Sequence, residues 1–309
     1  MLARRLGFRV LLLIGALGIV LTTFLTYVRP WYLRWGASDA ELTRSLPGDD
    51  IIPDATAQQT RAITIQAPIE RVWPWLAQLG QDRGGFYSFD LLENLVGCEM
   101  PVDDVLRPEH QVWRLGDKLW MYPPDKAGGA GFATLRSYVP GRALGFATRA
   151  VGTGLDEPEN GSWSFVLQPI DARRTRLLIR GRLAPGRSTA GVAFDRLVFE
   201  PIHFFMERRM MLGIKDLAEG RSRGRPVNHA QVGLWVLAFL LLSGTGVLLL
   251  RGDDWILAAM AFVSAALVFQ VLTLGQPPPA VGAAILVMAS APIVMEVRRS
   301  RALRAVRPS

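Results

Sequence analysis

Residues 199–217 read FEPIHFFMERRMMLGIKDL, and apolar side chains recur in this stretch at intervals of three or four. That spacing gives an α-helix one continuous apolar stripe, with charged side chains on another face. The helical pattern extends from about residue 193 to residue 219, and Pro201 is expected to kink it near its start. The sequence therefore predicts a long helix that buries one face against a domain. The stripe consists of Phe199, Ile202, Met206, Met210, Gly213 and Leu217.

Strand-like runs precede this helix, separated by clusters of Gly, Pro, Asn and Asp that are typical of turns. In the last run Leu177 and Ile179 fall on one face, so we expect the other face, rich in arginine, to meet water. The runs cover residues 118–122, 132–139, 143–149, 162–170 and 175–183, and an earlier alternating run, 61–66, is followed by two short helices, 69–79 and 89–96.

This order of elements predicts an α+β fold, in which a curved antiparallel sheet wraps around the terminal helix. If the wrap is incomplete, a cavity remains between the sheet and the helix. We expect apolar side chains to line that cavity: Phe165, Leu177 and Ile179 from the strands, and Phe199, Ile202, Met206 and Met210 from the stripe.

The folded domain is expected to cover residues 58–220. Residues 36–59 are rich in Asp, Pro, Ala and Thr, with few large apolar residues after Ile52. We therefore interpret residues 30–57 as a linker.

Four long apolar runs lie outside this domain, and only Arg9 interrupts them, at the start of the first. A bilayer core of about 30 Å needs roughly 20 helical residues, so three of the runs fit a membrane span better than a buried core helix. The fourth is shorter, so it is either a span extended by snorkelling arginines or a re-entrant or interfacial helix. The predicted parts are an N-terminal transmembrane anchor (1–29), transmembrane helices over 230–250, 255–276 and 280–297, and a basic tail (298–309).

The N-terminal run also resembles a signal peptide, because it has a basic start and an apolar middle. Its apolar stretch is longer than is usual for a signal peptide, and residues 26–30 lack an A-x-A cleavage site. We therefore expect an uncleaved anchor.

The formal net charge is +8, with a pI near 10.3, which at first suggests nucleic acid. The excess arginines lie in the two tails beside the apolar runs, and the rest of the chain is almost balanced. We therefore expect a multi-pass protein of the cell (inner) membrane with cytoplasmic tails, an extracytoplasmic domain and no nucleic-acid partner. Arginines at 29, 34, 221, 223 and 225 flank the opposite side and weaken this orientation.

The sequence gives little support for a metal site or for a functional cysteine. The single cysteine, Cys98, excludes an internal disulfide framework and a cysteine-based zinc site. Glu200 and His203 form one Glu-x-x-His pair, whereas di-iron bundles use two such pairs and further glutamates. We expect no metal and no cofactor, and a structural or surface-facing His203.

Several motifs resemble the START-like, or SRPBCC, superfamily, which has a helix-grip fold and includes relatives of polyketide cyclases and Bet v 1. The resemblance covers about residues 58–220 and is closest to a bacterial, often membrane-associated branch. It implies a cavity for a hydrophobic ligand but no particular activity, because the superfamily includes lipid carriers, receptors, cyclases and hydrolases. The motifs are APIERVWPWL (67–76), QLGQDRGGFYS (78–88), ENL (93–95), LRPE (106–109), GD (116–117), PIHFFMER (201–208) and MLGIK (211–215).

The segment 80–88 joins the two short helices, which in a helix-grip fold lie near the mouth of the cavity. Arg83 and Tyr87 are candidates to contact a ligand headgroup; alternatively, the segment is a structural turn in which Asp82 neutralises Arg83. For acid–base chemistry the candidates are Asp82, Tyr87, Glu93 and His203.

Three functional hypotheses follow. The first is a membrane-anchored module that binds a hydrophobic small molecule or a membrane lipid. The second is a cyclase- or hydrolase-type enzyme that uses the same cavity, and it requires a titratable group inside the pocket. The third is a structural or sensory membrane protein, which an exposed apolar patch without a cavity would favour.

Overall fold

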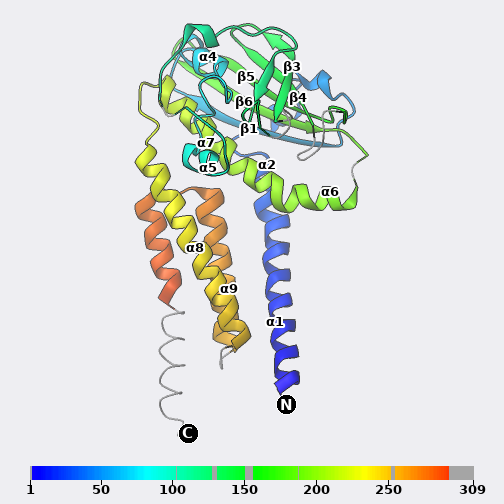
Figure 1. Cartoon of the computed structure of the whole chain (residues 1–309), viewed down its shortest axis with the longest axis vertical. Coiled ribbons are helices and arrows are strands. Elements are labelled where there is room, and N and C mark those ends of the chain that lie inside the picture. Colours follow the sequence, from blue (N-terminus) through cyan, green and yellow to red (C-terminus); the bar gives the residue numbers. More distant parts are fainter. Residues whose placement is uncertain are drawn as a thin grey trace. The chain divides into compact units, whose positions relative to one another are not determined.

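The computed structural model describes residues 2–101, 103–126, 131–149, 156–186, 188–251 and 255–291. The chain divides into two compact units. Unit 1 comprises Met1–Pro30 and Gly224–Ser309, and unit 2 comprises Trp31–Arg223. Both units appear in Figure 1.

Unit 1 is helical. Three helices are long and apolar enough to cross a membrane: Val10–Leu33, whose last residues belong to unit 2, Arg225–Leu250 and Trp255–Gly275. A shorter apolar helix, Pro279–Ala291, covers part of the fourth predicted span; residues 292–297 and the basic tail 298–309 lie outside the described residues. The elements are α1 (Leu2–Thr23), a π-helical turn (Phe24–Val28), the start of α2 (Arg29–Leu33, which continues into unit 2), α8 (Arg225–Arg251), α9 (Trp255–Gln270) and a second π-helical turn (Val271–Gly275).

Unit 2 is built on one six-stranded antiparallel sheet in the order β1-β6-β5-β4-β3-β2. The first and last strands of the sequence therefore meet, which brings Arg61 opposite Ile179. All six expected strand-like runs form strands (Figure 1). Their bounds are β1 Ala57–Ile65, β2 Lys118–Trp120, β3 Phe132–Val139, β4 Ala143–Thr148, β5 Gly161–Asp171 and β6 Arg174–Leu183.

The long helix begins earlier than the sequence suggests and runs without a break from residue 189 to residue 218. It consists of α6 (Thr189–Phe194), a π-helical turn (Asp195–Phe199) and α7 (Glu200–Ala218). The wide turn lies where Pro201 predicts a kink: the N–H of Glu200 donates to the carbonyl of Asp195, five residues back. Proline lacks an N–H and its ring collides with the carbonyl four residues earlier, and a wider turn relieves that collision.

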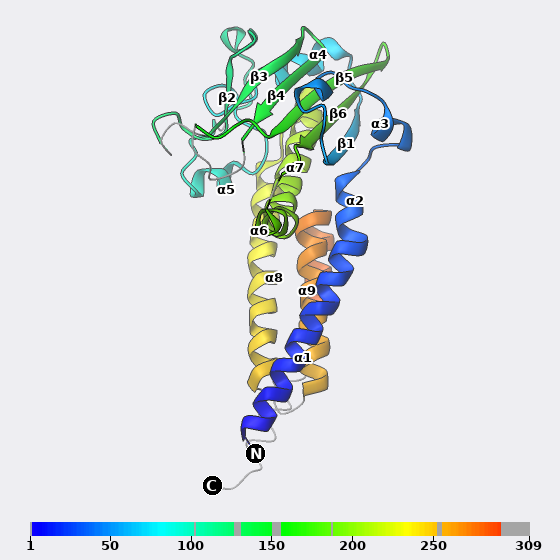
Figure 2. The same ribbon diagram turned by 90° about the vertical axis from the view of Figure 1, so that its right-hand side faces the viewer.

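The core lies between the sheet, α7 and the helix α4 (Ile69–Ala77). Met210, Met211 and Ile214 of α7 share one buried cluster with Leu177 and Ile179 of the sheet. Figures 1 and 2 show α7 crossing one face of the sheet. The predicted α+β helix-grip architecture is therefore confirmed. Shorter helices are α3 (Asp39–Thr43), a 3-10 turn (Asp49–Ile51), α5 (Asp90–Leu95) and a 3-10 turn (Pro108–His110).

The interpretation of residues 30–57 as a linker is wrong. Residues from Trp31 onward belong to unit 2, and Tyr32 and Leu46 are buried in it. Ser38 caps α3 with a capping box, accepting from the Glu41 N–H while the Glu41 carboxylate accepts from Ser38 N–H. Residues 30–57 have a polar composition because hydrogen bonds, and not a large apolar face, attach them to unit 2.

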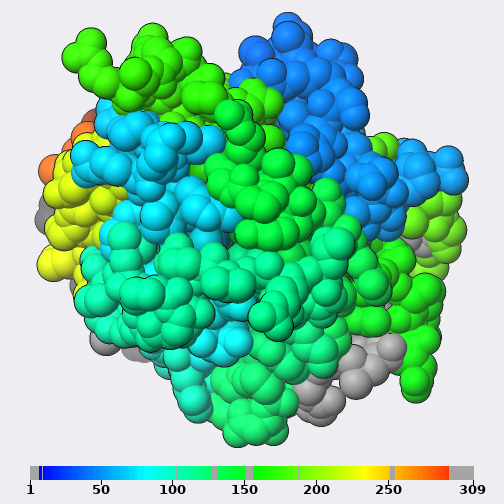
Figure 3. All heavy atoms as spheres, turned by 90° about the horizontal axis from the view of Figure 1, so that it is seen from above, coloured from blue at the N-terminus to red at the C-terminus, as the bar shows by residue number. Residues whose placement is uncertain are grey.

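This segment also corrects the expectation that the arginine face of the sheet meets water. The guanidinium of Arg180 is buried and donates to Asp49 and to the backbone carbonyls of Arg44 and Glu41. Arg176 binds the Glu41 carboxylate, whose pKa it lowers to about 2, mainly through that hydrogen bond. We call residues 36–53 the strap, because arginines of β6 fasten them to the sheet. Blue residues of this part of the chain lie at the edge of the face in Figure 3.

Residues between β1 and β3 cover much of the face shown in Figure 3, where they are coloured cyan to blue-green. They include α4, α5 and the loops on either side of β2. These loops supply one wall of a pocket in unit 2.

Candidate functional site

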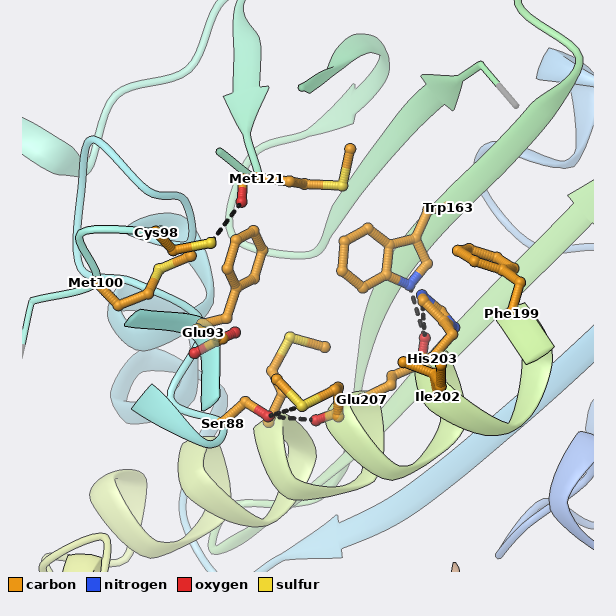
Figure 4. Close-up of a pocket in the computed structure, with 13 residues that line it drawn as sticks. Ser88, Glu93, Cys98, Met100, Met121, Trp163, Phe199, Ile202, His203 and Glu207 are labelled. Atoms are coloured by element: carbon orange, nitrogen blue, oxygen red, sulfur yellow. Dashed lines mark hydrogen bonds and ion pairs between the residues drawn. The ribbon is translucent and has the colours of Figure 1, made fainter. Parts of the chain in front are cut away.

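A partly open pocket of about 220 Å³ lies in unit 2 between α7 and the loops around α5 and β2. Figure 4 shows it in close-up. The helix contributes side chains one turn apart, as the apolar stripe requires. The lining residues are Phe86, Ser88, Glu93, Cys98, Met100, Met121, Trp163, Phe199, Ile202, His203, Met206, Glu207 and Met210.

Most of the lining is apolar. Four methionines give it flexible, polarisable side chains that adapt to irregular shapes. Three aromatic rings add flat surfaces: Phe86 stacks on Trp163 with ring centroids 6.1 Å apart, and Phe199 lies beside His203. Such a surface favours a ligand with an apolar body.

His203 provides a polar group on the α7 side of the pocket. Its ring stacks on Phe199 at 5.4 Å and meets Trp163 edge-on at 5.3 Å. Burial lowers the pKa of His203, against the opposite effect of the Glu207 carboxylate. Among the residues that the structure describes, its buried Nδ1 has no hydrogen-bond partner, so that atom is available to a ligand.

Glu207 lies one helical turn after His203, and its carboxylate is hydrogen-bonded to other side chains of the protein. Its carboxylate accepts from Arg61 Nη1 at 2.6 Å and from Trp163 Nε1 at 2.7 Å. Burial alone would raise the pKa of Glu207, but the charges of Arg61 and His203 and these hydrogen bonds lower it. Glu207 is therefore an anchored anion that positions Trp163 and faces His203 Nε2 at 3.8 Å.

Glu93 provides a second polar group, on α5, across the pocket in Figure 4. Burial, together with the neighbouring Asp90, raises the pKa of Glu93 to about 8 against the effect of Arg223. At neutral pH this carboxyl is therefore largely protonated and can donate as well as accept a hydrogen bond. Its Oε2 is buried, and no described residue forms a hydrogen bond with it.

Cys98 lies near this end of the pocket. Burial raises the pKa of its thiol, with a further contribution from Glu93. The thiol is therefore protonated at neutral pH, which agrees with a packed rather than a nucleophilic cysteine.

The structure brings six of the expected site residues to the pocket: Glu93, Phe199, Ile202, His203, Met206 and Met210. Phe165 does not reach it, because its ring fills the core between Phe146 and Trp163. Leu177 and Ile179 are likewise buried in the solid core under α7. These three positions are corrections to the expected lining.

The polar residues of the 80–88 segment also lie elsewhere. The guanidinium of Arg83 stacks on the Trp113 ring at 3.8 Å and donates to the carbonyl of His110, while Asp82 is exposed. Tyr87 is buried against Trp75, and burial raises its pKa, so it remains a neutral phenol. Arg83 and Tyr87 therefore do not line this pocket, although the same segment contributes Phe86 and Ser88 to it.

Several lining residues were not expected from the sequence. Trp163 shares its strand face with Phe165, so the alternation of β5 could have identified it. Met100 and Met121 come from loops, which have no periodicity to indicate a direction. Within the described ranges, no group of three or more His, Cys, Asp or Glu side chains is arranged to hold a metal ion.

No family model and no curated protein matches the sequence. Solved structures that resemble the chain cover about half of it. They include a conserved protein of unknown function from Enterococcus faecalis, at 12% identity and a TM-score of 0.32, over 53% of this chain and 71% of that one.

Two further solved structures resemble a similar share of the chain. A polyketide-cyclase-like protein of Corynebacterium glutamicum is 15% identical, with a TM-score of 0.25, over 52% of this chain and 85% of that one. An AHSA1-like protein of Rhizobium etli is 16% identical, with a TM-score of 0.30, over 54% of this chain and 85% of that one. These likenesses bring no activity or ligand to this chain.

Unit 2 itself defines the class: a six-stranded antiparallel sheet gripping a long C-terminal helix is the START-like, helix-grip fold. The resemblance stated from the sequence motifs is confirmed at the level of the fold.

Proposed function

We propose that the chain is a membrane-anchored module that binds an apolar small molecule or part of a lipid in the pocket of unit 2. The observation that carries this proposal is the lining, which is mostly apolar but includes two buried polar atoms, His203 Nδ1 and Glu93 Oε2, that have no hydrogen-bond partner in the described part of the chain. Ligand pockets commonly combine an apolar body with a few polar groups that set orientation.

The volume limits the ligand. A pocket of about 220 Å³ is smaller than the range of roughly 300–1,000 Å³ that is usual for drug-sized molecules. It suits a small ring system or one end of a longer molecule whose remainder extends through the open side. Rearrangement of the methionines would allow a larger guest.

The proposed location is the cell membrane, with unit 2 outside the cytoplasm. Three helices of sufficient length and apolarity support membrane anchoring. Anchoring at the bilayer raises the local concentration of any ligand that partitions into lipid, without new contacts in the pocket.

The test compares molecules that copurify with the full chain and with Met206→Trp, which fills the pocket. Both proteins are extracted with a styrene–maleic acid polymer, and their organic extracts are analysed by mass spectrometry. The surrounding lipid is common to both samples, so we expect one apolar species to be depleted in Met206→Trp. The same substitution at exposed Leu115, outside the pocket, is the control. Identical extracts from all three proteins would refute the proposal.

A second candidate function, an enzyme of cyclase or hydrolase type, is favoured by one observation. Glu93 and His203, both with shifted pKa values, line the same pocket. An enzyme predicts that Glu93→Gln or His203→Gln accumulates a copurifying molecule of a different mass from that in the wild type. A binding module predicts the same molecule at a changed occupancy.

A further inference from the structure

The first turns of the long helix carry a row of large apolar side chains that remain exposed. Leu197 is 45% exposed and Ile202 is 51% exposed. Their spacing of three, one and four residues places them along one side of the helix. We call this row the apolar ridge; it consists of Phe194, Leu197, Val198 and Ile202.

The apolar ridge borders the pocket. Ile202 belongs to the ridge and also lines the pocket, and Phe199, between Val198 and Glu200, points into it (Figure 4). Figures 1 and 2 show α6 running along the border of unit 2, beyond the strands. A single exposed leucine is ordinary on a protein surface, but a continuous apolar row beside a pocket marks an interaction site.

The path of the chain indicates that the apolar ridge lies close to the end of a candidate membrane span. The candidate membrane span Val10–Leu33 ends inside unit 2, because Trp31 and Tyr32 pack against α7. The Tyr32 hydroxyl donates to Glu200 Oε2 at 3.1 Å, and the Trp31 ring meets Phe204 edge-on at 5.5 Å. Leu197 and Val198 lie three and two residues from Glu200, a rise of about 3–5 Å along a helix.

The side chains around the ridge suit the interface between lipid and water. Trp31 is exposed over 42% of its surface, and tryptophan prefers the headgroup region of a bilayer. Arg196 is exposed on the same turn as Leu197 and can reach lipid phosphates, whereas the neighbouring Asp195 is buried. Apolar side chains next to a cation are typical of an interfacial helix.

We propose that the apolar ridge inserts into the headgroup region of the bilayer, so that the pocket exchanges its ligand with the lipid phase. The proposed occupant of the ridge is a lipid surface rather than another protein. This inference rests on the membrane anchoring proposed above.

The test measures the depth of one ridge residue in the full chain. Leu197→Cys and Ile170→Cys are each made in a Cys98→Ala background, labelled with bimane and reconstituted into vesicles of phosphatidylcholine and phosphatidylglycerol. Ile170 is the matched control, because it is apolar and similarly exposed at 47%. Ile170 is seven residues from Trp163 along β5, which is about 23 Å in a strand. Trp163 contacts His203 of the long helix, so Ile170 lies far from that contact.

Phosphatidylcholine brominated near the top of its acyl chains is the quencher. We expect it to reduce the fluorescence at residue 197 by roughly twofold and to leave that at residue 170 almost unchanged, as for a helix half-inserted at the interface. Equal quenching at both residues, weak or strong, would overturn the inference. A blue-shifted but unquenched probe at residue 197 would also overturn it, by indicating a protein partner.

The two proposals fail in different ways. If the chain does not float with the vesicles, the proposed membrane anchoring is wrong. If it floats but residue 197 is not preferentially quenched, only the ridge inference is wrong.

Discussion

Glu207 and Arg61 form an ion pair whose side chains are almost completely buried, at 1% and 0% exposed. Arg61 also donates to the carbonyl of Tyr32 and to Gln59, and Glu207 also accepts from Trp163. The negative charge of the Glu207 carboxylate therefore stabilises the buried Arg61 guanidinium, and its two oxygens accept from Arg61 and Trp163.

We predict that Glu207→Gln lowers the free energy of unfolding by about 3–5 kcal/mol, because it leaves the Arg61 guanidinium buried without a counter-charge. Thermal unfolding monitored by circular dichroism measures the effect. Asp171→Asn is the control, since its pair with Arg174 is half-exposed and solvent already screens it. An equal fall in melting temperature, relative to the wild type, in Glu207→Gln and Asp171→Asn would contradict this account.

Glu93 gives the stability of unit 2 a dependence on pH. Its pKa is about 8 in the folded chain, above its ordinary value of 4.5, so the folded state retains a proton that the unfolded state releases between these values. Stability is therefore lost as the pH rises through this window.

We predict that Glu93→Gln removes this loss. The melting temperature of the variant should exceed that of the wild type at pH 8.5 and approach it near pH 4, where both states are protonated. Unfolding scans from pH 4 to pH 9 test the sign. A constant difference across this range would show that Glu93 titrates normally.

At the scale of elements, three π-helical turns precede three prolines by the same distance. The turns end at Val28, Phe199 and Gly275, and Pro30, Pro201 and Pro277 each follow two residues later. At Pro30 and Pro201 the wide turn lets the helix continue past the proline, whereas at the third turn the helix ends at Gly275 and Gln276 is left-handed. On the long helix the chain therefore stays helical from α6 into α7, although the two lie at an angle to each other (Figures 1 and 2), and the apolar ridge depends on that continuation.

Close packing of α7 depends on Gly213. A Cβ atom at this position would lie 2.2 Å from the carbonyl oxygen of Tyr87, whose φ of +54° already marks a constrained turn. We predict that Gly213→Ala destabilises unit 2 by about 1–3 kcal/mol through overpacking, although alanine favours helices.

Gly233→Ala is the control for this substitution, because nothing lies within 4 Å of a Cβ atom there. Its melting temperature should be unchanged or slightly higher. Equal effects of the two substitutions would indicate that helix propensity, and not the contact with Tyr87, decides the outcome.

The strap is fastened mainly by Arg180. We predict that Arg180→Met releases it, because the Asp49 carboxylate and the backbone carbonyls of Arg44 and Glu41 lose their donor. Amide hydrogen exchange should become faster in residues 38–52 and change little in β4. Arg174→Met, at an exposed position of the same strand, should leave the strap protected. Unchanged exchange in Arg180→Met would refute this role.

At the scale of the whole molecule, the distribution of arginines predicts which side of the membrane unit 2 occupies. We predict that Leu115→Cys, at a residue 67% exposed in unit 2, reacts with a membrane-impermeant maleimide in intact cells. Reaction only after the cells are permeabilised would place unit 2 in the cytoplasm. The Cys98→Ala background removes the other thiol.

The sequence indicated much of unit 2 correctly because its elements are periodic. The alternation in residues 175–183 and the helical stripe in residues 199–217 each depend on one face being buried, and local spacing records that burial directly. The strap escaped prediction because hydrogen bonds to β6 hold it, and its own composition resembles that of a linker.

The sequence alone determined the order of strands and helices, the long apolar stretches and the α7 side of the pocket, since each follows from neighbouring residues. Only the tertiary structure decided the opposite wall of the pocket, the burial of Phe165 in the core and the pairing of Arg61 with Glu207. Those two residues are 146 positions apart, and no local pattern encodes a contact that chain folding alone brings together.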